Sequence, residues 1–164
     1  KKIFYKQPMK NKKEKGEKAE KKFIEYLDKH KIPYWYIQQD INTYSKALKN
    51  YNIQRPDFFI LIPDKGFILI DVENKIPLKK YSKFCICDLK TKKYQNLQKI
   101  FNLEIFYAIT NDKMHFSTWY FLPISKAVEL RKKYLVKEKN YISAPIDSFT
   151  QLSNNENFTK LLAG

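Results

Sequence analysis

The stretch that decides the fold is residues 55–75, RPDFFILIPDKGFILIDVENK. It contains two apolar runs, Asp57 to Ile62 and Phe67 to Lys75, separated by Pro63-Asp64-Lys65-Gly66. Pro and Gly suit a tight turn, and two strand-like runs joined by such a turn are typical of an antiparallel hairpin. The sequence therefore predicts a hairpin at the centre of the fold.

The second run carries its charges on one side only. Side chains alternate along a strand, so Asp71, Glu73 and Lys75 share one face. The opposite face is apolar and consists of Ile68, Ile70 and Val72. Antiparallel pairing brings the end of this run beside Asp57, which opens the first run. The end of this strand therefore carries charged side chains on one face and apolar side chains on the other.

These charged residues suit the hydrolysis of a phosphodiester. That reaction needs a hard cation to neutralise developing charge and to lower the pKa of the attacking water. Mg²⁺ prefers a few carboxylates plus water, and Asp57 and Glu73 supply carboxylates. Lys75 can hold the water, help to deprotonate it or stabilise charge on the phosphate without competing for the metal.

Outward from the hairpin, the apolar spacing predicts the other elements. Before it, residues 11–30 form a helix, with Asn11 and Glu14 as a capping box, followed by a strand at 34–37 and a surface loop at 38–54. After it come a strand at 84–89, a helix at 94–103 and strands at 105–110 and 116–122. A helix capped by Ser125 then runs to about residue 134, and the tail beyond Val136 is polar and irregular.

Composition narrows the function. The 164 residues are expected to form a single domain, and a formal charge of +15 favours a polyanionic partner, above all nucleic acid. A basic protein of the membrane surface is the competing class, but the sequence contains no compelling amphipathic segment. It shows neither a signal peptide nor an apolar run long enough to span a bilayer, so an intracellular protein is expected.

Arg55-Pro56-Asp57 and, sixteen positions after the aspartate, Glu73-Asn74-Lys75 resemble the signature of the PD-(D/E)xK nuclease superfamily. The order of the predicted elements is similar to the αβββαβ core of that superfamily. The resemblance implies an α/β fold of the restriction-endonuclease-like or Holliday-junction-resolvase-like type, with a mixed central sheet flanked by helices. The core would cover about residues 13–110, and residues 111–164 would add a strand, a helix and a tail.

The resemblance also implies roles for the motif residues. Asp57 and Glu73 would bind Mg²⁺, for which Mn²⁺ would substitute, the backbone carbonyl of Asn74 would be a further metal ligand, and Lys75 would serve the water. Many members place a glutamate of the first helix in the site. Glu20 is the candidate here, since Phe23 and Leu27 make that side of the helix face the core.

Further candidates come from neighbouring segments. Glu17, one turn before Glu20, is the fallback for the helix glutamate, and some family members use a glutamine of the second helix, here Gln95 or Gln98. The basic residues expected to contact the phosphate backbone are Arg55, Lys79, Lys80 and Lys83.

The function expected from sequence is that of a Mg²⁺-dependent endonuclease acting on double-stranded or branched DNA, with RNA left open. A homodimer would cut both strands of a duplex. The alternative is a nucleic-acid-binding or assembly module that keeps a vestigial nuclease site.

Overall fold

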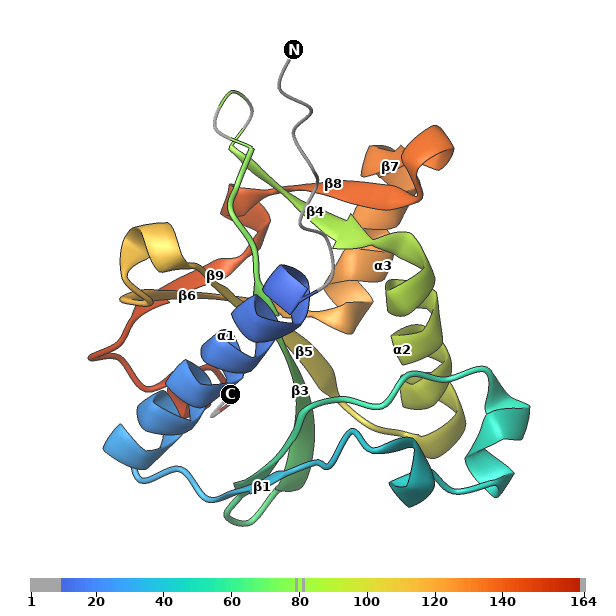
Figure 1. The fold of residues 1–164 in the computed structure, drawn as a ribbon, viewed down its shortest axis with the longest axis horizontal. Helices are drawn as coiled ribbons and strands as arrows, with labels where there is room; N and C mark the ends of the chain where they lie inside the picture. Colours follow the sequence, from blue (N-terminus) through green and yellow to red (C-terminus); the bar gives the residue numbers. More distant parts are fainter. Residues whose placement is uncertain (1–9, 79, 81, 163–164) are drawn as a thin grey trace.

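The computed structural model describes residues 10–78, 80 and 82–162. Three α-helices and nine strands follow one another along these residues (Figure 1). The helices are α1 (Lys10–Lys29), α2 (Asp88–Phe101) and α3 (Ile124–Tyr134). The strands are β1 (Tyr34–Tyr36), β2 (Phe58–Ile62), β3 (Gly66–Asn74), β4 (Lys83–Cys87), β5 (Ile105–Thr110), β6 (Thr118–Pro123), β7 (Leu135–Val136), β8 (Tyr141–Pro145) and β9 (Thr150–Ser153).

Six of these strands form the central sheet, in the order β1-β2-β3-β5-β6-β9. Strands β3 and β5 are parallel and the other neighbours are antiparallel, so the sheet is mixed, as the sequence predicts. The hairpin of β2 and β3 pairs Phe58 with Ile70 and closes at Ile62 and Gly66. Gly66 has a φ of +105°, a backbone conformation that glycine adopts without strain.

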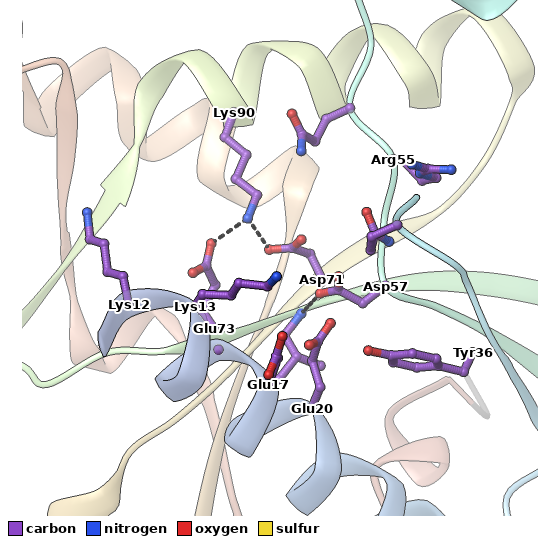
Figure 2. A pocket seen from close by; sticks show the side chains of 14 residues that line it. Lys12, Lys13, Glu17, Glu20, Tyr36, Arg55, Asp57, Asp71, Glu73 and Lys90 are labelled. Carbon is purple, nitrogen blue, oxygen red and sulfur yellow. Dashed lines mark hydrogen bonds and ion pairs between the residues drawn. The ribbon is translucent and has the colours of Figure 1, made fainter. Parts of the chain in front are cut away.

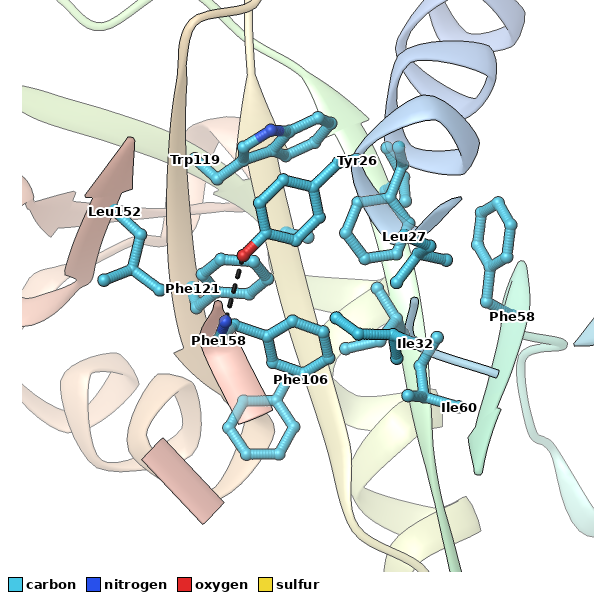
Figure 3. Close-up of a cluster of buried hydrophobic side chains, with 14 of the residues drawn as sticks. Tyr26, Leu27, Ile32, Phe58, Ile60, Phe106, Trp119, Phe121, Leu152 and Phe158 are labelled. Carbon is cyan, nitrogen blue, oxygen red and sulfur yellow. Dashed lines mark hydrogen bonds between the residues drawn. The ribbon is translucent and has the colours of Figure 1, made fainter. Parts of the chain in front are cut away.

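One face of the sheet is covered by α1, which contacts β3. Phe23 and Leu27 of this helix are fully buried against Phe58, Phe121 and Trp119 (Figure 3). Burying a large apolar side chain contributes about 1.5–3 kcal/mol, so this interface holds α1 firmly in place. The apolar face predicted for the second run of the hairpin, Ile68, Ile70 and Val72, lies in this cluster.

The other face of the sheet is covered by α2, α3 and the small antiparallel sheet β4-β8-β7. Leu69 and Tyr107 of the central sheet pack there with Tyr94 of α2 and Leu130 of α3. Figure 1 shows α1 on one side of β3 and β5 and the other two helices on the opposite side. Both helical layers therefore meet β3, the strand that carries the predicted motif.

Helix α2 corrects the sequence analysis. It begins at Asp88, six residues before the predicted start at Tyr94, and the strand before it ends at Cys87 and not at Leu89. The first turns of α2 bury the polar side chains of Asp88 and Thr91, so apolar periodicity does not mark them. Asp88 is instead held by Arg131 of α3, whose Nε lies 2.6 Å from Asp88 Oδ1.

The C-terminal tail is also more regular than predicted. Strand β8 pairs with β4, and β9 extends the central sheet next to β6. These strands are hard to recognise in the sequence because polar residues stand next to the buried residues Ile142, Ala144 and Leu152.

Two predicted helix caps are wrong. Helix α1 already includes Lys10, so Asn11 is not its N-cap, and Ser125 lies inside α3, whose N-cap is Pro123. In the described ranges no helix combines the length and the apolar character needed to cross a bilayer.

Candidate active site

A cavity of about 360 Å³ opens between α1, the start of β2, the middle of β3 and the first turn of α2 (Figure 2). Five carboxylates line it, and four of them, Glu20, Asp57, Asp71 and Glu73, interact with one another from α1 to β3. The remaining lining is formed by Lys12, Lys13, Gly16, Glu17, Tyr36, Gln39, Gln54, Arg55, Val72 and Lys90. We call this hollow the carboxylate cavity.

Backbone pairing fixes the position of Asp57. Its N–H donates to the carbonyl of Ile70, and its Oδ2 accepts a hydrogen bond of 2.8 Å from the N–H of Val72. The register that pairs Phe58 with Ile70 places Asp57 opposite Asp71, one step further along the hairpin. The structure therefore brings Asp57 to the charged end of β3, as the sequence predicts.

Glu20 approaches Asp57 from α1. The two carboxyl groups lie within hydrogen-bonding reach of each other, and Tyr36 contacts Glu20 as well. Burial and the neighbouring Glu20 raise the pKa of Asp57 to about 8, and burial also raises the pKa of Glu20. Burial and the two carboxylates raise the pKa of Tyr36 to about 12. Among the described residues, neither Glu20 nor Asp57 has a lysine or arginine as an ion-pair partner.

At the other end, the cation is Lys90 of α2. Its Nζ lies 2.8 Å from Glu73 Oε1 and 2.9 Å from Asp71 Oδ2. Asp71 is only 2% exposed, and its Oδ1 accepts a hydrogen bond from the Tyr94 hydroxyl. Burial raises the pKa of Asp71 although Lys90 opposes the shift, whereas for Glu73 the charges of Lys90 and Lys75 outweigh burial and lower the pKa.

Two motif residues are not part of the cavity wall. Lys75 follows the last residue of β3, and its backbone is tied to the end of β5 through Thr110 and the Asn111 side chain. Asn74 donates from its side-chain amide to the carbonyl of Lys15 and to Asp112 Oδ1, which joins β3 to α1 and to the segment after β5. The residues of β3 that line the cavity are Asp71, Val72 and Glu73.

Some of the other predicted site residues line the cavity and others do not. Glu17 lines the cavity beside Glu20, but Gln95 and Gln98 do not: both border a separate hollow near α3. Gln98 is occupied there, because its Oε1 accepts a hydrogen bond from the N–H of Ile105. The structure thus corrects the expectation that a glutamine of the second helix reaches the site.

Of the predicted phosphate contacts that the structure describes, only Arg55 lines the cavity, and its guanidinium donates to Thr43 Oγ1 and to the carbonyl of Asp40. Lys83 lies over the ring of Tyr134, 5.1 Å from its centroid, and Lys80 is exposed on the segment before β4. Lys79 lies outside the described residues.

Two residues that form ion pairs in this cavity, Asp71 and Lys90, are not among the site residues predicted from the sequence. The alternation along the hairpin already puts Asp71 on the same face as Glu73, opposite Asp57, and this was the available signal. No motif marks Lys90, since only the fold carries the first turn of α2 to the end of β3.

The donor set suits a hard divalent cation. Mg²⁺ is commonly held by one or two carboxylates, with water and substrate oxygens as its other ligands, and Glu20 and Asp57 form such a pair. Asp71 Oδ2 is buried, and its partner is the Lys90 ammonium group at 2.9 Å. Among the described residues, no group of three or more acidic, histidine or cysteine side chains is arranged to hold a metal ion.

The sheet order and the flanking helices define the class of fold: it is α/β, of the restriction-endonuclease-like type found in PD-(D/E)xK nucleases. Two solved structures share it. Hjc, a Holliday junction resolvase from Archaeoglobus fulgidus, is 13% identical with a TM-score of 0.51, and the match covers 82% of this chain and 91% of that one. D212, a nuclease from a fusselovirus, is 18% identical with a TM-score of 0.52, and the match covers 96% of this chain and 92% of that one. The sequence itself matches no family model and no curated protein.

Proposed function

We propose that the protein is a divalent-metal-dependent nuclease that hydrolyses phosphodiester bonds in DNA at the carboxylate cavity. The observation that carries this proposal is the group of interacting carboxylates Glu20, Asp57, Asp71 and Glu73, of which the last two are ion-paired with Lys90. The basic residues Lys12, Lys13 and Arg55 line the same cavity and form its basic rim. The fold supports it, because two proteins that share the fold are described as a nuclease and a Holliday junction resolvase.

In this proposal Asp57 is the central metal ligand, with Glu20 on one side and Asp71 and Glu73 on the other. When bound, Mg²⁺ or Mn²⁺ would supply a Lewis acid and lower the pKa of the attacking water. The protein's own groups would orient the phosphate: a lysine ammonium would stabilise the negative charge, and the basic rim would hold the flanking backbone. Water would form the new bond to phosphorus, the bond to the leaving oxygen would break, and that oxygen would take up a proton.

The proposal also covers the type of DNA, the oligomeric state and the cellular location. A resolvase among the structural neighbours favours duplex or branched DNA. Cutting both strands with one cavity per chain favours a homodimer with two-fold symmetry. Such an enzyme would act inside the cell, where its DNA substrate is found.

The test is cleavage of supercoiled plasmid, linear duplex, a four-way junction and single-stranded RNA with Mg²⁺, Mn²⁺ or EDTA. Asp57→Asn keeps the shape of the side chain and an acceptor for the Val72 N–H, and we expect it to reduce the rate by at least about 100-fold. The matched control is Asp64→Asn in the exposed turn between β2 and β3, which should cleave like the parent.

Metal-dependent cutting that survives in Asp57→Asn would refute the assignment of the site. Tight binding of nucleic acid without cutting of any substrate would instead support the alternative function, a binding module with a vestigial site.

A further inference from the structure

The cation that faces the carboxylates comes from α2 and not from the strand motif. Lys90 Nζ lies within 2.9 Å of both Asp71 and Glu73, and Lys90 lines the same cavity as Asp57 (Figure 2). Lys75 does not line that cavity. Two lysines therefore carry charge close to Glu73, but only one of them reaches the space that a substrate phosphate could enter.

At its position in α2, the positive charge of Lys90 lowers the stability of the helix. It lies in the first turn of α2, where the helix dipole disfavours a positive charge. The ion pairs with Asp71 and Glu73 offset that cost. The two carboxylates, and not the helix dipole, therefore account for a lysine at this position.

Lys90 also has capacity left for a ligand. An ammonium group has three N–H donors, and the two contacts to Asp71 and Glu73 use at most two of them. The Lys90 side chain keeps 25% of its surface exposed, while that of Asp71 keeps 3%. The remaining donor can therefore point to a phosphate oxygen or to water in the cavity.

A second layer of contacts holds this arrangement from behind. The Tyr94 hydroxyl donates to Asp71 Oδ1, and Tyr94 is fully buried one turn further along α2. Tyr94 and Lys90 come from the same helix, and both contact the carboxylate of Asp71. Asp71 is thus a positioning residue that aims Lys90 at the cavity.

We propose that Lys90 takes the role that the sequence motif assigns to Lys75, donating a hydrogen bond to the scissile phosphate and stabilising its charge as water attacks phosphorus. This inference rests on the proposed nuclease function. The lysine that contacts the phosphate then comes from α2. Asn74 and the backbone of Lys75 hold the end of β3 against α1 and the end of β5.

The test compares Lys90→Met, Lys90→Arg and the matched variant Lys75→Met with the parent and with Asp57→Asn. Single-turnover cleavage with Mg²⁺ is measured beside metal-free DNA binding and thermal unfolding. We expect Lys90→Met to lower the cleavage rate by about 100-fold or more, and Lys75→Met by less than about fivefold. In metal-free binding, only Lys90→Met should reduce the salt dependence, by about 0.9 in the logarithmic slope.

Lys90→Arg separates a catalytic from a structural role, because it preserves the charge and the ion pairs and so the fold. We expect it to unfold like the parent but to cleave about tenfold more slowly or worse, since a guanidinium does not reproduce the geometry of a single ammonium donor. Added ethylammonium should partly restore cleavage by Lys90→Ala and have no effect on Lys75→Ala.

The outcomes distinguish the two proposals. If Asp57→Asn is inactive while Lys75→Met loses activity and Lys90→Met keeps it, the nuclease function stands and the assignment of Lys90 is overturned. If Lys90→Arg is as active as the parent and ethylammonium rescues nothing, Lys90 is a structural ion pair. If the parent shows no metal-dependent cleavage, the nuclease function itself fails, and the role of Lys90 fails with it.

Discussion

The N–H of Val72 donates a hydrogen bond of 2.8 Å to the Asp57 carboxylate, so that a side chain at the start of β2 is fastened to the backbone of β3. This contact fixes one oxygen of Asp57, and the carboxyl group also lies within hydrogen-bonding reach of Glu20. It also places the carboxyl group beside Glu20 on one side and Asp71 on the other. Asp57 is therefore held in a position where its negative charge is unfavourable unless a cation arrives.

Asp57→Asn should stabilise the metal-free protein at alkaline pH. Burial and Glu20 raise the pKa of Asp57 to about 8, against about 3.9 in an unfolded chain. The folded state binds more protons, so the contribution of this carboxyl group to the unfolding free energy falls as pH rises from about 4 to about 8. We expect a gain on the order of 1 kcal/mol at pH 9 in EDTA, or about 2–4 °C in the melting temperature.

Three measurements check the cause of this gain. It should shrink as pH falls towards about 4 and vanish near pH 2, where the aspartate is protonated in both states. It should reverse when Mg²⁺ is added, because an ion that binds only the folded parent stabilises it by about 2.7 kcal/mol at a hundredfold excess over its Kd. Asp64→Asn, in the exposed turn, should show neither effect. A gain that is equal at pH 4 and pH 9 would contradict the charge argument.

The hairpin could be predicted because its signals are local. Alternation along residues 67–75 and the turn Pro63 to Gly66 lie within one stretch of chain, and the mixed α/β sheet with flanking helices follows from them. The start of α2 could not be predicted in this way, since Asp88 is buried through an ion pair with Arg131, which lies more than forty residues later. Strands β8 and β9 are harder to predict because β4 and β6, with which they pair, lie far away in sequence. The local partner of β8 is β7, which has only two residues.

The same distinction between local and long-range signals applies to the residues of the site. Asp57 and Glu73 were found from the spacing of one motif, and Glu20 from the face of one helix; all three line the carboxylate cavity. Lys75 was chosen because it completes a pattern in sequence, and a pattern does not state where the side chain lies once β3 has ended. Lys90 has no such pattern, because its place beside Glu73 depends on how α2 packs on the sheet.

Asp88→Asn should destabilise the protein at neutral pH, the opposite of Asp57→Asn. Burial alone would raise the pKa of Asp88, but Arg131 and Lys92 outweigh it and lower the pKa. This stabilisation is fully present above the unfolded pKa of about 3.9 and is lost as pH falls through the lower pKa of the folded state. Urea unfolding should show a loss of about 1–2 kcal/mol at pH 7 that shrinks towards pH 2.

The control for this variant is Glu129→Gln on the exposed side of α3. Its partner Lys126 is 3.4 Å away, and both side chains are largely exposed, so the change should stay within about 0.5 kcal/mol. An Asp88→Asn variant as stable as the parent at pH 7 would mean that the pair with Arg131 does not anchor α2.

The rim of the cavity leads to the last prediction, which concerns DNA binding. Lys12 and Lys13 in the first turn of α1 line the cavity, and each should contact a backbone phosphate. The double variant Lys12→Ala/Lys13→Ala should reduce the slope of log affinity against log salt by about 1.8, since each lost phosphate contact lowers it by about 0.9. Lys65→Ala/Lys99→Ala removes the same charge from hollows away from the cavity and should change the slope much less. Equal slopes for the two double variants would show that DNA senses only net charge, whereas a larger change in Lys80→Ala/Lys83→Ala would place the DNA along the segment predicted from sequence.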